Sequence, residues 1–249
     1  MFPIRDHNPS ERTPYVTYLL MAANILVYLM TYEAMQSEAQ TIELLENWSL
    51  VPRFMAEGGS WHPVVTSLFM HAGFMHLAGN MLFLWIFGDN MEDFFGHFGF
   101  LVFYMVCGIA ASLTHYYSDP VSLVPTVGAS GAIAGVLGGY LLLFPRARID
   151  VIFFFIVFFK IFPVRAWVML AIWFGLQLIN SSIVDPDTGG VAYWAHIGGF
   201  VAGFVLTIPF WLRRGGPSFW GQSQGQPPHP AAEYELTRTS IPVVRRRRR

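Results

Sequence analysis

Charged side chains are scarce in this sequence. Aspartate, glutamate, lysine and arginine make up only 12% of its 249 residues, and hydrophobic residues make up 54%. An ordinary soluble domain carries roughly 25% charged residues, so this composition excludes that class. Together with the length of its apolar runs, it indicates a membrane protein.

Cysteine is nearly absent as well. Cys107 is the only one, which excludes an internal disulfide framework, and a lone cysteine in an apolar run usually behaves as a small hydrophobic residue. The sequence also lacks a His-Glu-x-x-His motif, and its histidines have no carboxylate at ligand spacing. We therefore expect neither a metal site nor another cofactor.

Long apolar runs are plentiful. A helix of about 20 residues crosses a hydrocarbon core of about 30 Å. Windows of this length predict six spans, at 14–32, 76–95, 98–117, 127–145, 165–183 and 191–212. The predicted fold class is an all-α membrane protein, a six-helix transmembrane bundle at 14–213. It follows an N-terminal segment, 1–13, and precedes a tail at 214–249, which is predicted to be disordered because it is rich in Gly, Pro, Ser and Gln.

The stretch VIFFFIVFFKIFPV at 151–164 does not fit a span. It is apolar but short, it is rich in β-branched and aromatic residues, and Lys160 and Pro163 interrupt it. We interpret it as an extended or interfacial connection, because exposed strand edges in lipid would leave backbone groups unpaired. A seventh, tilted half-helix is the alternative.

Positive charges predict the orientation. When six spans alternate, one side receives almost all of them: Arg5, Arg12, Arg146, Arg148, Lys160, Arg165, Arg213, Arg214, Arg238 and residues 245–249. The positive-inside rule then places both termini in the cytoplasm. The N-terminus does not resemble a transit peptide, which favours a bacterial plasma (inner) membrane. The five final arginines could bind anionic lipid headgroups, or they could be only a solvated run of charges. Nucleic acid is a less favoured partner than either.

A few polar residues lie inside the predicted spans, where they are costly and so mark functional candidates. His76 and Asn80 lie in the second span, Ser130 in the fourth and His196 in the sixth. Each is about a turn inside the outer end of its helix, so their side chains reach a similar depth. A serine beside a histidine suggests a nucleophile and its general base.

Glycines in the fourth and sixth predicted spans would allow these two helices to pack closely. Gly131, Gly135 and Gly139 recur every four residues, and Gly199 and Gly203 have the same spacing. Faces of small residues let helix backbones come close together. This packing would bring the serine hydroxyl within hydrogen-bond reach of the imidazole.

Three ordered motifs resemble the rhomboid family of intramembrane serine proteases. They are HAGFMHLAGN at 71–80, GASG at 128–131 and AHIGGFVAG at 195–203, and the likeness covers about residues 12–213. The resemblance implies hydrolysis of peptide bonds within or near transmembrane segments, at a water-accessible cavity open to the extracytoplasmic side. The partners it implies are the lipid bilayer and transmembrane protein substrates, with no nucleic acid. The oligomeric state stays open.

The resemblance also implies roles for individual residues. Ser130 would be the nucleophile and His196 the general base, in a dyad without a third acidic member. His76 and Asn80 would donate to the oxyanion together with the Ser130 backbone N–H, and His71 would have a structural or supporting role. The motif glycines expected to support the site are Gly128, Gly131 and Gly199.

Two departures from the family pattern concern the neighbours of the site. The loop after the first span carries Trp61-His62, where many members have Trp-Arg, and Ala134 stands where some members have an aromatic residue that stacks on the imidazole. His196 must then be oriented by other neighbours, with Tyr193, Trp194 and the backbone as candidates. We expect four further histidines at the surface, His7, His97, His115 and His229, and Glu92 to cap or pair locally or to brace helices.

Two other functions compete with proteolysis. One is a catalytically inactive relative that binds transmembrane helices; the presence of both Ser130 and His196 argues against it. The other is a small transporter that uses His76 and His196 as proton carriers. It would need a polar path through the membrane, but the inner halves of the fourth and sixth spans contain almost no titratable side chain.

Overall fold

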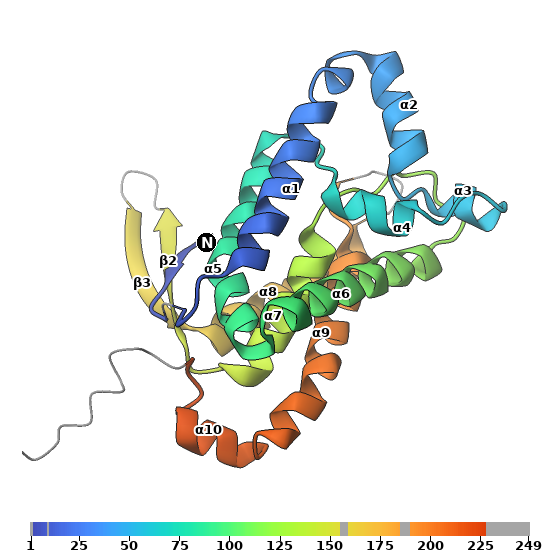
Figure 1. The fold of residues 1–249 in the computed structure, drawn as a ribbon. Coiled ribbons are helices and arrows are strands. Elements are labelled where there is room, and N and C mark those ends of the chain that lie inside the picture. The colour runs from blue at the N-terminus through green and yellow to red at the C-terminus, as the bar shows by residue number, and fades with distance from the viewer. Residues whose placement is uncertain (1, 9, 155–158, 185–189, 228–249) are drawn as a thin grey trace, which may run out of the picture.

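Six long helices form the body of the protein in the computed structural model, which describes residues 2–8, 10–154, 159–184 and 190–227 (Figure 1). They are α1 (Tyr15–Thr31), α5 (Phe74–Phe95), α6 (His97–Ser118), α7 (Ser130–Leu143), α8 (Ala166–Ile183) and α9 (Tyr193–Arg213). Their positions match the six predicted windows closely. The protein is therefore mostly helical, with its helices where the apolar runs place them.

Not all six helices are long enough to span a membrane by themselves. Of the described helices, α6, α8 and α9 are long and apolar enough to cross, and α5 becomes a fourth if it forms one broken span with residues Pro63–Phe69, which meet it at 92°. The apolar helices α1 and α7 are shorter. At 1.5 Å per residue, the 14 residues of α7 extend only about 21 Å. The count of six spans stays a prediction.

Short elements connect the long helices. At one end lie η1 (Ala34–Gln36), α2 (Glu38–Trp48), α3 (Pro52–Ala56), α4 (Pro63–Thr66) and η2 (Ser67–Phe69). At the other end lies α10 (Pro217–Ser223) (Figure 1). The predicted disordered tail thus begins with a helix, which is held because the Trp220 indole donates to the carbonyl of Leu142 at 2.8 Å and its ring packs on Trp211. Residues 228–249, with His229, lie outside the described residues.

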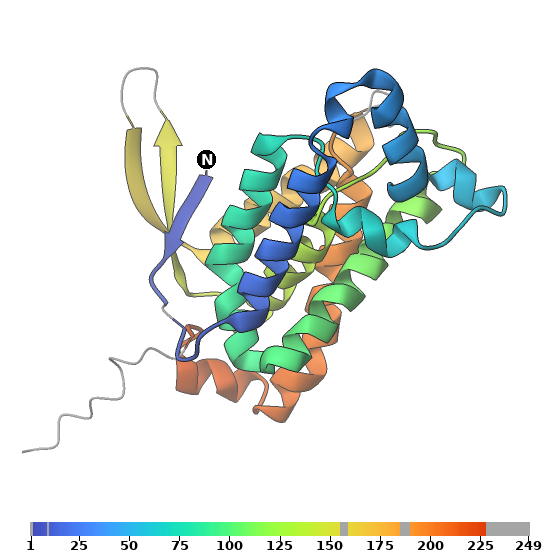
Figure 2. The same ribbon diagram turned by 45° about the horizontal axis from the view of Figure 1, so that its top comes forward.

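The most buried helix is α7, which has an apolar residue on every face. Twelve of its fourteen residues are buried, as expected for a helix that is hydrophobic all round. Helices α6 and α9 pack directly against it, and α5 and α8 approach it from the other sides (Figure 2). The serine at its first position is therefore set into the centre of the bundle.

Glycine makes the contact between α7 and α9 unusually close. A Cβ atom added at Gly203 would overlap the backbone of Gly135, and one added at Gly199 would overlap the carbonyl oxygen of Gly131. The predicted small-residue faces thus meet backbone against backbone. We call this contact the glycine seam.

A three-stranded antiparallel sheet lies beside the helices (Figure 2). Its order is β1 (Phe2–Asp6), β2 (Arg148–Phe154), β3 (Phe159–Arg165). The extended interpretation of 151–164 is confirmed for the residues described there, whereas 155–158 lie outside them. The all-α fold class is incomplete, because the N-terminal segment supplies a third strand from a distant part of the sequence.

An ion pair fastens β1 to β2. Arg5 and His7 contact the two oxygens of Asp150, at 2.8 and 2.7 Å. Burial opposes ionisation of this carboxyl, but the hydrogen bonds from His7 and Arg5 outweigh it and hold the pKa of Asp150 below its ordinary value. His7 is half exposed, as a surface residue would be, yet it is also a structural partner.

Glu92 connects two helix ends. Its buried carboxylate accepts the backbone N–H groups of Val16 and Thr17, at 2.9 and 2.7 Å, and pairs with His97. It therefore caps the first turn of α1 and compensates for donors that lack an intrahelical acceptor. The predicted bracing of neighbouring helices is what the structure shows.

Candidate active site

Ser130 is the first residue of α7, and the backbone just before it packs closely against neighbouring residues. Gly128 has a φ of +130°, donates its N–H to the carbonyl of Ser67, and leaves no room for a Cβ beside the His76 ring. Only glycine combines that backbone conformation with that contact. The first intrahelical bond runs from Ile133 to Ala129, so the N–H of Ser130 has no acceptor within the helix.

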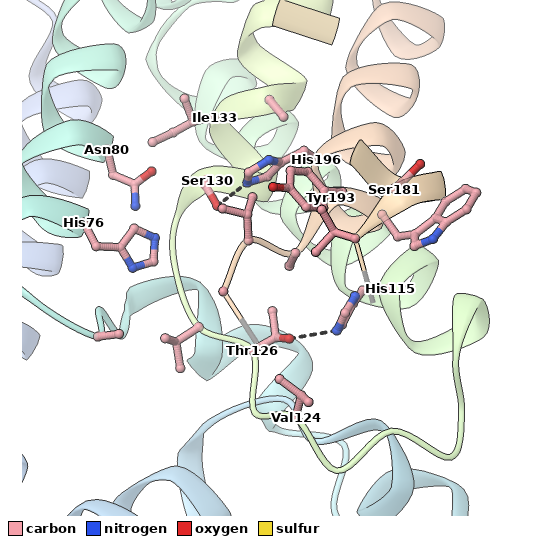
Figure 3. Close-up of a pocket in the computed structure, with 18 of the residues that line it drawn as sticks. His76, Asn80, His115, Val124, Thr126, Ser130, Ile133, Ser181, Tyr193 and His196 are labelled. Carbon is pink, nitrogen blue, oxygen red and sulfur yellow. Dashed lines mark hydrogen bonds between the residues drawn. The ribbon is translucent and has the colours of Figure 1, made fainter. Parts of the chain in front are cut away.

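His196 lies on α9 and faces the serine. Its Nε2 is 2.8 Å from the Ser130 Oγ (Figure 3). Its Nδ1 is 2.8 Å from the Oε1 of Gln177. Gln177 is buried and comes from α8. The three side chains form one chain of hydrogen bonds across three helices.

The glutamine determines which ring nitrogen carries the proton. Its own Nε2 donates to the carbonyl of Trp173 at 3.3 Å, which leaves Oε1 to face the imidazole. A carbonyl oxygen only accepts, so Nδ1 of His196 must donate, and the neutral ring then presents a lone pair on Nε2 to Ser130. This is the tautomer that a general base requires.

An aromatic ring flanks the imidazole despite the alanine at 134. The ring centroid of Trp173 is 5.7 Å from that of His196, with an interplanar angle of 33°. The orienting neighbours are therefore Trp173 and Gln177 of α8, rather than Tyr193, Trp194 or the backbone. The expectation is wrong because the sequence does not show which face of the fifth span turns toward His196.

Polar groups from α5 face the serine from the opposite side. Figure 3 shows His76 and Asn80 pointing into the cavity in front of Ser130. The Nδ2 of Asn80 is buried and has no hydrogen-bond partner among the described residues. Buried donors normally have an acceptor, so this amide is available to donate to a group that enters the cavity. His71 is buried behind them, with its ring 5.2 Å from that of His76.

Ser130, His196, His76 and Asn80 line a cavity of about 680 Å³. It is large enough for an extended segment of a few residues, within the range of small-molecule sites. His115 also lines it and bonds the hydroxyl of Thr126 at 2.8 Å. We had placed His115 at the surface; that was wrong, because the loop that precedes α7 folds back over the end of α6.

Sequence reasoning missed Gln177, Trp173 and His115. The signal for Gln177 was present, since it is a polar residue inside an apolar span, AWVMLAIWFGLQLIN, and such residues are functional candidates by default. For the other two, only the packing of α8 and of the loop reveals their position.

Comparison with known proteins assigns the chain to a family. The family model "Rhomboid domain" matches residues 58–213, which is more than half of the chain. The chain belongs to the rhomboid family. The matched segment contains all the residues described above for the cavity and its hydrogen bonds.

Relatives agree with this assignment. Rhomboid protease GluP of Bacillus subtilis (strain 168) is 29% identical over 203 residues, which cover 82% of this chain and 36% of that protein. Rhomboid protein 1, mitochondrial, of Saccharomyces cerevisiae is 35% identical over 146 residues, 57% of this chain and 40% of that protein. RHOMBOID-like protein 5 of Arabidopsis thaliana is 27% identical over 242 residues, 85% of this chain and 74% of that protein. The chain thus spans 36% and 40% of the first two relatives.

Proposed function

We propose that this rhomboid protein is an active intramembrane serine endopeptidase. The observation that carries the proposal is the hydrogen bond of 2.8 Å between Ser130 Oγ and His196 Nε2 at the wall of a cavity. Ser130 attacks the scissile carbonyl, and His196 takes its proton and gives it to the leaving amine as the C–N bond breaks; a water molecule that His196 activates then hydrolyses the acyl-serine. Gln177 accepts from Nδ1–H and so keeps the neutral imidazole in the base tautomer before each attack.

The tetrahedral oxyanion would be stabilised from two sides. The N–H of Ser130 lies at the N-terminus of α7, where the helix dipole favours negative charge, and Asn80 contributes its unpaired amide. His76 adds a third donor beside Gly128. Donors positioned before reaction stabilise developing charge without reorganisation, which is usually the largest single contribution to catalysis.

The substrates we propose are transmembrane proteins. A helix satisfies its own backbone hydrogen bonds, so a segment must unwind locally before its carbonyl reaches Ser130. This favours substrates with small or helix-breaking residues near the end that meets the cavity. We propose that the cavity opens to the extracytoplasmic side of a plasma membrane.

The decisive experiment compares two serines of the same cavity. Ser130→Ala should abolish labelling by a fluorophosphonate probe and cleavage of a single-pass model substrate in proteoliposomes, with folding intact because alanine suits a helix. Ser181→Ala is the matched control: Ser181 also lines the cavity, but its hydroxyl bonds the carbonyl of Leu178. It should keep both activities.

His196→Ala tests the base. It should lose cleavage, because an unassisted hydroxyl is a weak nucleophile at neutral pH. Labelling that persists in Ser130→Ala would reject the nucleophile. A folded parent chain that neither labels nor cleaves would favour the inactive relative that binds transmembrane helices.

A further inference from the structure

A second cavity lies at the other end of α7 from Ser130. Its volume is about 260 Å³ and it is polar; its lining residues are Arg146, Arg148, Arg165, Gln224 and Gln226. They come from the connection between α7 and β2, the start of β2, the end of β3 and the chain that follows α10. We call it the arginine cavity.

Two of its arginines occupy electrostatically unfavourable positions. Arg148 and Arg165 are direct partners in the register of β2 and β3, and like charges opposite each other destabilise a strand pair. Arg165 is also the N-cap residue of α8, where the helix dipole repels a cation. Arginines that served only to fix topology would not need to converge in this way.

Among the described residues, no carboxylate compensates for these charges. In the described part of the chain, none of the three guanidinium groups forms an ion pair or a side-chain hydrogen bond, whereas Arg5, nearby on β1, does both. The carboxylate two residues along β2, Asp150, is already shared by Arg5 and His7. The cavity therefore has a local excess of positive charge.

The walls of the cavity are tied together. Arg146 donates its backbone N–H to Gly225 at 2.8 Å. Gly225 has a φ of +67° and packs against the aliphatic stem of Arg146, where a Cβ would lie 3.3 Å from Cγ. The bond from the Trp220 indole to the carbonyl of Leu142 holds α10 in place. The arginines thus converge on a shaped site with amide donors from two glutamines.

We propose that the arginine cavity binds the phosphate of an anionic phospholipid headgroup. The planar guanidinium fork matches phosphate oxygens and donates two hydrogen bonds at once. Basic pockets at the ends of membrane helices suit such headgroups. The proposal does not depend on proteolysis.

Tryptophans favour a lipid over a free phosphate ion. Trp167, two residues after Arg165, is 48% exposed, and Trp211 of α9 packs against Trp220 of α10. Tryptophan is enriched where membrane meets water. The cavity therefore lies at the depth of the headgroups, where lipid phosphate is concentrated.

Thermal stability in nanodiscs tests the proposal. The melting temperature of the full chain should be higher in discs that contain phosphatidylglycerol than in discs of phosphatidylcholine alone, because bound lipid stabilises the folded state. The variant Arg148→Gln/Arg165→Gln should lose most of that gain. In phosphatidylcholine it should be at least as stable as the parent, because the repulsion across the strands is gone.

A charge-matched control removes two arginines elsewhere. Arg248→Gln/Arg249→Gln should keep the gain in phosphatidylglycerol, although it has the same net charge. Native mass spectrometry should show phosphatidylglycerol retained by the parent and by this control, with affinity for it at least about tenfold weaker in the cavity variant, since hydrogen bonds to charged groups are the strong ones.

Three results would overturn the proposal. The cavity variant could keep the same gain as the parent, the tail control could lose it equally, or inorganic phosphate could stabilise the parent in phosphatidylcholine discs as much as phosphatidylglycerol does. The last would identify a free-anion site.

Discussion

At the residue scale, Gln177 gives the proposed dyad a neutral amide at the place where a Ser-His-Asp triad has its acidic third member. Gln177→Leu keeps a similar volume but removes the acceptor for Nδ1 of His196. We expect kcat to fall by about 10–100-fold, a part of the 10²–10⁴ that a general base contributes, while KM changes little. Steady-state cleavage of the model substrate measures both.

A conservative variant separates positioning from packing. Gln177→Glu restores an acceptor oxygen and should recover part of the lost kcat, whereas a purely structural glutamine would show no such rescue. Parent-level kcat in Gln177→Leu, accompanied only by a changed melting temperature, would remove this residue from the mechanism.

Asn80 offers a second separation of function from structure. If its amide donates only to the oxyanion, Asn80→Ala should lower kcat by about 10²–10³ with little change in KM. If it merely bonded a neighbouring helix, the loss would instead be about 1 kcal/mol of stability. Kinetics and melting temperature should be measured on one preparation. A destabilised variant that still turns over at the parent rate would leave the oxyanion to His76 and the Ser130 N–H.

At the residue scale, the sequence signalled which polar residues would gather at one cavity, whereas their catalytic roles stay predictions. A serine, two histidines and an asparagine inside apolar spans stand out because lipid penalises polar groups, and the structure places Ser130, His196, His76 and Asn80 around one cavity. Gln177 was also signalled as a polar residue inside an apolar span, but its contact with His196 and the position of Trp173 beside the ring depend on the rotation of α8, which no local pattern in that helix determines.

At the element scale, the glycine seam limits what α7 and α9 tolerate. Gly203→Ala places a methyl group where the Gly135 backbone already lies, and overpacking of this kind costs about 1–3 kcal/mol. We expect a lower melting temperature. We also expect lower activity, because Ser130 lies on α7 and His196 on α9, and a shift between the helices changes the distance between the two side chains. Thermal unfolding in detergent measures the effect.

Gly175→Ala is the matched control. This glycine is in the middle of α8 and a Cβ there would meet nothing within 4 Å, so alanine should be neutral or stabilising by up to about 1 kcal/mol. Equal destabilisation by the two substitutions would mean that helix propensity, rather than contact between the helices, explains the glycines.

Helices and sheet differed in how well they could be predicted. An apolar window predicts a helix because all the residues that form the helix are adjacent in the sequence. The six long helices were located in this way. Predicting the sheet requires knowing the partner of each strand. β3 follows β2 closely in the sequence, but β1 pairs with β2 across 145 residues, the separation between Arg5 and Asp150. The sequence FPIRD contains no signal for that partner.

At the scale of the whole molecule, the six-span count makes a prediction about sides. Figure 1 shows α3 and α10 at opposite ends of the long helices. In a Cys107→Ala background, Glu57→Cys should react with an impermeant maleimide in intact cells. Gln222→Cys should react only after the membrane is disrupted, because an even number of spans returns the chain to the side on which it began. Labelling of both positions in intact cells would contradict the topology.

The long sequence separation between β1 and β2 also affects the order in which the elements can assemble during synthesis. Synthesis proceeds at about 5–20 residues per second, so the residues of β2 emerge roughly 7–30 s after those of β1. During that interval the first strand has no edge to pair with, although α1, α5, α6 and α7 are already available to pack. Pairing of β1 with β2 thus becomes possible only after α1, α5, α6 and α7 have been made, and before α8 and α9, the helices that carry Gln177 and His196, follow.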